Sequence, residues 1–147
     1  MLRLPLLLFF MLTFAPLAGP AHAQAGPATA SLRVEVIVAS AEEGQVDAAL
    51  RDLQRRLQTQ FSQFRSFVLR SRETWTLQAG QSASLPLLPN VNATFRLLSV
   101  NGERAEVEVT VPGGQTTVAL PPSGLVFVAG PRDAEGRTLI LALRRVE

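Results

Sequence analysis

The acidic residues of this chain include two groups whose types and spacing could support chemistry. Glu106 and Glu108 lie two residues apart in a segment that alternates like a β-strand, which places their Cβ atoms about 7 Å apart on one face. Paired carboxyl groups are what a glycoside hydrolase uses. Glu42, Glu43 and Asp47 offer oxygen ligands for a hard cation, but they lack the alternating spacing of a calcium loop. A carboxylate-dependent hydrolase is therefore kept as an alternative, while a solvated strand face is the simpler interpretation of Glu106 and Glu108.

The residue types that are missing exclude most other catalytic chemistry. The chain has no cysteine and no tyrosine, its one histidine is His22, and all 14 basic residues are arginines. No Ser-His-Asp or Cys-His arrangement, lysine Schiff base or zinc site of the usual kind can be built from such a composition. Glycine-rich nucleotide-binding patterns are missing as well. The sequence predicts no catalytic, cofactor-binding or metal-binding residues.

Arginines are concentrated in one stretch of the chain. Six of them fall within 22 residues, and these are Arg51, Arg55, Arg56, Arg65, Arg70 and Arg72. Such a group could bind an anionic ligand, although nearby acids offset half of its charge and an ordinary solvated surface is the alternative. Nucleic-acid binding would require exposed aromatic residues between the arginines, and the nearby phenylalanines fit a core stripe better.

A second candidate surface is the charged loop at residues 130–136, because loops on a rigid sheet often carry recognition. Together the helix face, the following strand and this loop give the predicted interaction surface, which consists of Arg51, Arg55, Arg56, Arg70, Arg72, Arg132, Asp133 and Glu135.

The first 23 residues have the pattern of a cleaved Sec-type signal peptide. A basic start at Arg3 is followed by an apolar run over residues 4–14, and Ala21-His22-Ala23 supplies the small residues that signal peptidase requires. The run is too short to span a bilayer, which needs about 20 residues. We therefore expect cleavage after Ala23, a periplasmic or secreted product without a transmembrane anchor, and a flexible leader over residues 24–31. Because arginine replaces lysine throughout, a bacterial source with GC-rich coding is favoured.

Residues 32–147 are expected to form one domain. Residues 32–39 read as a strand, and Val46, Leu50, Leu53, Leu57, Phe61 and Phe64 then follow at helical spacing as one apolar stripe. From residue 66 the period becomes two, with Phe67, Leu69, Trp75 and Leu77 predicted to share a face. This order predicts a β-α-β opening, parallel if both strands lie in one sheet.

The second half reads as a series of antiparallel strands joined by turns. Asn101-Gly102 is a strong hairpin signal, and residues 104–111 alternate clearly between valine and polar positions. The predicted fold class is α+β, with one amphipathic helix packed on a mostly antiparallel sheet or small sandwich of about seven to eight strands. The proline-rich segments leave single sheet and two-layer sandwich both open.

The segments VEVIVAS, VDAALRDLQRRLQTQF, SFVLRSRETWTL and TLILAL resemble a group of small exported bacterial proteins of unknown function. The resemblance implies a stand-alone exported α+β domain and no activity. Removing residues 1–23 leaves 13 arginines and 12 acidic residues, a net charge of +1, so general polyanion binding is not predicted. We expect a non-catalytic binding domain without a cofactor, whose partner is an envelope protein. A small-molecule or lipid carrier, with its ligand between helix and sheet, is the first alternative.

Overall fold

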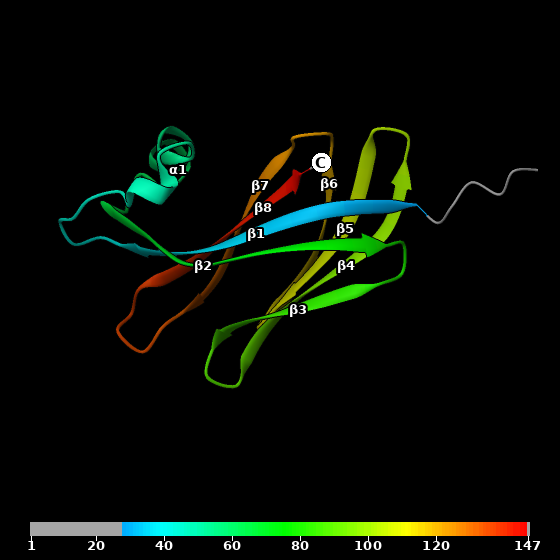
Figure 1. Cartoon of the computed structure of the whole chain (residues 1–147). Helices are drawn as coiled ribbons and strands as arrows, with labels where there is room; N and C mark the ends of the chain where they lie inside the picture. Colours follow the sequence, from blue (N-terminus) through cyan, green and yellow to red (C-terminus); the bar gives the residue numbers. More distant parts are fainter. Residues whose placement is uncertain (1–27, 147) are drawn as a thin grey trace, which may run out of the picture.

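The computed structural model describes residues 28–146, and the predicted signal peptide lies outside them. Eight strands and a short helical segment occupy this range (Figure 1). Their bounds are β1 (Thr29–Ser40), η1 (Ala48–Leu50), α1 (Gln54–Gln60), β2 (Ser66–Gln78), β3 (Ser82–Leu88), β4 (Val91–Asn101), β5 (Arg104–Val111), β6 (Gly114–Leu120), β7 (Leu125–Arg132) and β8 (Thr138–Val146). The first residues of β1, from Thr29, fall within the range that the sequence assigned to the leader.

The strands form two four-stranded sheets in which every strand pair is antiparallel. Sheet A has the order β2-β1-β8-β7 and sheet B the order β3-β4-β5-β6. The chain passes from sheet A to sheet B after β2 and returns after β6 (Figure 1). The expectation of a mostly antiparallel fold with seven to eight strands is confirmed, and of the two architectures left open the structure is sandwich-like.

The main core lies between the two sheets. Sheet A contributes Leu32, Val34 and Val36 from β1, and sheet B contributes Phe95 and Val107 among others, all without exposed surface. In β3, β4 and β5 the core residues alternate with more exposed ones, because successive side chains of a strand point to opposite faces. Burial of this alternating set is what fixes the register of the sandwich.

A second core lies on the outer face of sheet A, beneath the helical segment. Leu50 and Leu57 pack there on Ile37, Phe67 and Ile140. The helical segment lies over one end of β1 and β2, away from sheet B (Figure 1). The central strands β1 and β8 are therefore covered on both faces over part of their length, which explains why their sequences are apolar at consecutive positions. No helix within residues 28–146 has the length and apolar composition needed to cross a membrane.

The predicted parallel β-α-β opening is wrong. The strand, helix and strand occur in that order, but β1 and β2 are antiparallel neighbours from Thr29↔Gln78 to Ser40↔Ser66. The helical stripe is also interrupted, because it is divided between η1 and the seven-residue α1. A seven-residue helix is about 10 Å long, whereas the twelve residues of β1 span about 40 Å. Such a helix cannot carry the chain back along β1, so β2 starts beside the end of β1 and runs the other way.

A β-bulge at Arg70 changes which face of β2 is apolar. Ile37 pairs with Leu69 and Val36 pairs with Ser71, so Arg70 is an extra residue in β2. Before the bulge, Phe67 and Leu69 pack in the core beneath the helical segment, and after it Trp75 and Leu77 pack between the sheets. The expectation that these four residues share one face is therefore wrong, because an inserted residue reverses the alternation.

Candidate functional site

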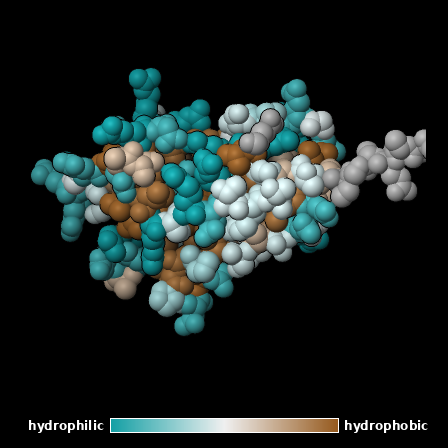
Figure 2. Space-filling model, viewed as in Figure 1, coloured by the Kyte–Doolittle hydropathy of each residue, from teal (hydrophilic) through white to brown (hydrophobic). Residues whose placement is uncertain are grey.

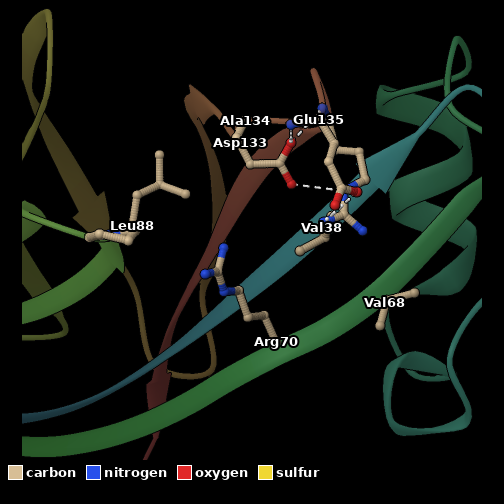
Figure 3. Close-up of a pocket in the computed structure, with 9 residues that line it drawn as sticks. Val38, Val68, Arg70, Leu88, Asp133, Ala134 and Glu135 are labelled. Atoms are coloured by element: carbon tan, nitrogen blue, oxygen red, sulfur yellow. Dashed lines mark hydrogen bonds and ion pairs between the residues drawn. The ribbon is translucent and has the colours of Figure 1, made fainter.

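An open cavity of about 490 Å³ lies at one end of the sandwich, between β2, the β3–β4 turn and the β7–β8 loop. We call it the Arg70 cavity. Its apolar wall includes Val38, Val68 and Leu88, and its charged residues are Arg70, Asp133, Glu135 and Arg137. Figure 3 shows Arg70 extending from β2 into the space between Leu88 and the loop that carries Asp133. Four segments, β1 included, thus meet around one opening.

The apolar wall of this cavity is partly open to solvent. Val68 is 47% exposed and is the exposed large hydrophobic residue identified within residues 28–146. In the half of the molecule that carries α1, the space-filling view shows hydrophobic surface between hydrophilic side chains (Figure 2). An exposed apolar side chain alone is ordinary, but here it lies beside a cavity that also contains a charged group, which is the usual composition of a recognition site.

Arg70 is the charged group of the cavity that is left without a partner. It forms no hydrogen bond and no ion pair with any residue in the range 28–146, whereas Arg137 contacts both acids of the loop. The bulge accounts for its direction, because an extra residue lets a side chain leave the regular alternation of the strand. A free guanidinium presents donors suited to a carboxylate.

Asp133 organises the loop on the opposite side of the cavity. Its Oδ1 accepts hydrogen bonds from the backbone N–H groups of Glu135 and Arg137, at 3.0 and 2.9 Å, and its Oδ2 lies 2.8 Å from Nε of Arg137. Removal from water would raise the pKa of Asp133, but these hydrogen bonds and the charge of Arg137 outweigh that effect and hold its pKa below 3.8. The loop is therefore held by an ionised carboxylate.

We expect Asp133→Asn to lower the melting temperature by a few degrees at pH 7, because the ion pair with Arg137 is lost. A carboxyl with a lowered folded-state pKa stabilises the fold above its unfolded-state pKa, near 3.8, and the contribution disappears as the pH falls through the folded-state value. The difference between wild type and variant should thus shrink below about pH 4. Thermal unfolding of wild type and variant at pH 7 and below about pH 4 measures this difference. Glu43→Gln is the control, since Glu43 is 90% exposed, and an equal loss in both variants would contradict the assignment.

A second open cavity, of about 580 Å³, lies between the outer face of sheet A and the helical segment. We call it the Arg33 cavity. Arg33 in β1 and Arg144 in β8 are direct cross-strand partners there, and Arg56 comes from α1. Nη2 of Arg144 lies 2.9 Å from Oδ2 of Asp52, the one carboxylate among the described residues that line this cavity.

The Arg33 cavity has two features that are unfavourable in the protein alone. Like charges directly opposite each other on neighbouring strands are destabilising, and Arg33 and Arg144 are such a pair. In addition, Nε of Arg33 is buried and donates a hydrogen bond to none of the described residues. An unsatisfied buried donor costs about 1–3 kcal/mol.

The eight residues of the predicted interaction surface are divided between several places. Arg70, Asp133 and Glu135 come together at the Arg70 cavity, and Arg132 lies with Glu135 at a neighbouring hollow. Of the helix arginines, Arg56 lines the Arg33 cavity, while Arg51 and Arg55 are exposed on the helical segment. Arg72 forms an ion pair with buried Glu35 at 3.1 Å, so its guanidinium group is already engaged within the protein. No single arginine surface spans the whole set.

Sequence reasoning missed Val68, Leu88, Arg33 and Arg144. Regular alternation from residue 66 places Val68 on the face opposite Phe67, together with Arg70 and Arg72, because the sequence does not reveal the bulge. Arg33 gave a usable signal, since it stands on the same strand face as Ile37 and Ala39, and a charged residue on a face that becomes buried requires a partner. Its neighbour Arg144 could not be found without the β1–β8 pairing.

The carboxylates considered for catalysis lie elsewhere. Glu106 and Glu108 stand on β5 of sheet B, where Oε2 of Glu106 accepts from Ser99 at 3.5 Å and Glu108 pairs in register with Arg96. Neither lines the two cavities described above. Within residues 28–146 there is no cluster of three or more acidic, histidine or cysteine side chains that could hold a metal ion.

The comparisons give no relative for this chain. No protein-family model, no curated protein and no solved structure matches it.

Proposed function

We propose that the protein is an exported, non-catalytic binding domain of the bacterial envelope and that its partner is an envelope protein. The observation that carries the proposal is the Arg70 cavity, in which an unpaired guanidinium stands beside an open apolar wall. The predicted signal peptide over residues 1–23 supports export to the periplasm or beyond.

The composition of the cavity specifies what the partner must present. Val38, Val68 and Leu88 offer apolar contact, and Arg70 offers donors for a carboxylate. The two loop acids are engaged with Arg137, at 2.8 Å from Asp133 and 3.1 Å from Glu135, which leaves Arg70 available. A segment that places an apolar side chain next to an Asp or Glu satisfies both parts of the cavity.

The rigid frame around the cavity favours binding of a preformed partner surface. Val68 is fixed on β2 by its pairing with Val38 of β1, and Asp133 fixes the loop through its three hydrogen bonds. Preorganised groups lose little conformational entropy on binding, so even a small interface of this kind can be specific.

Site-specific photo-crosslinking in cells tests the proposal. A photoreactive amino acid at position 68 is expected to capture one envelope protein reproducibly, whereas the same group at Thr117, exposed on β6 of sheet B, is not. Arg70→Glu should reduce the yield at position 68 at least tenfold, because it replaces attraction by repulsion across the contact. The matched control is Arg55→Glu, an equal charge change on exposed α1.

Two results would overturn the proposal. One is the same set of captured proteins from positions 68 and 117, which would indicate unspecific contact. The other is capture at position 68 that is equally strong in wild type and Arg70→Glu, because the guanidinium would then have no part in recognition. Circular dichroism of each purified variant confirms that the sandwich has formed, so a lost cross-link reports the surface and not the fold.

A further inference from the structure

We infer that the Arg33 cavity is a binding site for a phosphate group, on a soluble ligand or on a lipid headgroup. This site is separate from the Arg70 cavity, and the inference does not depend on the proposed function. It rests on the arrangement of Arg33, Arg56 and Arg144 around one opening between sheet A and the helical segment.

The first step is the charge at the opening. Three guanidinium groups come from three different elements, and Asp52 is the carboxylate that the described residues supply against them. Arg145 also lines the cavity, but its Nη1 donates to the carbonyl oxygen of Glu103 in the β4–β5 turn at 2.8 Å and is thereby engaged. The neighbouring carboxylate on the same face, Glu35, is neutralised by Arg72 at 3.1 Å. A net positive charge therefore remains, which suits an anionic phosphate group.

The second step is the unsatisfied chemistry of Arg33. Its Nε is buried without an acceptor among residues 28–146, and its cross-strand neighbour is another arginine. An oxyanion between Arg33 and Arg144 accepts hydrogen bonds from the terminal nitrogens of the two guanidinium groups and removes the repulsion between the two like charges. Arginine suits this role because its planar donors fit the oxygens of a phosphate in pairs.

The third step is the remaining space. Leu53, Leu125 and Val146 form an apolar part of the lining, and a cavity of about 580 Å³ is larger than a phosphate group requires. We therefore expect the phosphate to carry an organic substituent that contacts Leu125 and Val146, which are both partly exposed.

Isothermal titration of the purified protein with phenyl phosphate tests the site. Phenyl phosphate should bind at least tenfold more tightly than inorganic phosphate, because it also contacts the apolar side chains, and benzyl alcohol should not bind. Arg33→Gln and Arg144→Gln should each weaken binding at least tenfold. Arg56→Gln should also weaken binding. Because Arg56 is exposed, its replacement leaves the fold intact, so this variant reports on the site even if the other two variants fail to fold. Arg51→Gln and Arg55→Gln are the matched controls, on the same helical segment but outside the lining, and should change affinity less than twofold.

The source of the phosphate is separated by a second measurement. Co-sedimentation with phosphatidylglycerol vesicles, compared with phosphatidylcholine vesicles, shows whether a lipid headgroup reaches the site. Phenyl phosphate binding without co-sedimentation assigns a soluble ligand, and co-sedimentation that Arg33→Gln and Arg56→Gln abolish assigns a headgroup. The inference is overturned if neither probe binds, or if the control variants weaken binding as much as the lining variants do, since binding would then follow total charge and not this site.

Discussion

Replacing Phe95 by alanine is expected to lower the free energy of unfolding by about 3–5 kcal/mol. Phe95 is fully buried in β4 and is one of the largest side chains between the two sheets. Its ring centroid lies 5.6 Å from that of Trp75 on the opposing sheet. Alanine would leave a cavity between the two sheets. The hydrogen-bonded strands hold each sheet in shape, so the sheets cannot approach each other closely enough to fill this cavity.

Urea denaturation followed by tryptophan fluorescence measures this effect directly, because Trp75 is the single tryptophan of the chain and contacts the substituted side chain. Val68→Ala is the control, since Val68 is exposed and its truncation should change stability by less than about 0.5 kcal/mol. A loss for Phe95→Ala no larger than that of the control would show that the two sheets do not form a tightly packed core.

Several strands of this protein could be predicted because their side chains alternate between buried and exposed positions. In β5 the residues Ala105, Val107 and Val109 are buried and the intervening ones are not, as the alternating sequence indicates. The choice between one sheet and two layers could not be made in the same way. It depends on which strands pair across long stretches of chain, and β1 pairs with β8 from the other end of the domain.

The helical region and β2 show where local patterns fail. The apolar stripe correctly marked Leu50, Leu53 and Leu57 as core residues, but it did not reveal that the helix breaks between η1 and α1. In β2 the bulge at Arg70 is defined only relative to β1. The one-residue shift in pairing could not be predicted from the sequence. The extra residue is an arginine, and nothing in its type marks it as lacking a partner on β1.

The candidate sites were predictable in their parts and not in their assembly. Arg70, Asp133 and Glu135 could be chosen from sequence as charged residues on a strand and a loop, but only the fold brings them to one cavity. The Arg33 cavity depends on the register Arg33↔Arg144, and neither residue belongs to the arginine-rich stretch over residues 51–72. Clustering in sequence was therefore a poor guide to clustering in space.

The ion pair between Arg72 and Glu35 leads to the second large prediction. Glu35 is 2% exposed and is the buried charged residue identified in the described range. Its Oε2 accepts a hydrogen bond from Nη2 of Arg72 at 3.1 Å, and the same nitrogen lies 3.4 Å from the carbonyl oxygen of Ala49 in η1. The pair thus joins β1, β2 and the start of the helical segment.

Arg72→Ala is expected to lower the free energy of unfolding by about 2–3 kcal/mol, because it leaves a buried carboxylate without its cation. The value is set below the 3–5 kcal/mol typical of a fully buried pair, since the side chain of Arg72 is 42% exposed and water screens part of the interaction. Urea denaturation at neutral pH measures the loss. Arg70→Ala is the matched control on the same strand, because Arg70 has no ion pair among the described residues, and it should cost less than about 0.5 kcal/mol.

The double variant Glu35→Leu/Arg72→Ala separates the charge effect from the loss of packing by the arginine side chain. If the uncompensated carboxylate causes the loss, the double variant is more stable than Arg72→Ala alone, because an apolar residue then occupies the buried position next to Ile37 and Ala142. If instead the aliphatic part of Arg72 supplies the stability, removing Glu35 as well brings no recovery. The second outcome, or an equal loss in Arg70→Ala and Arg72→Ala, would contradict the role given to this pair and would place the stability of the helical segment in the apolar contacts of Leu50, Leu53 and Leu57 alone.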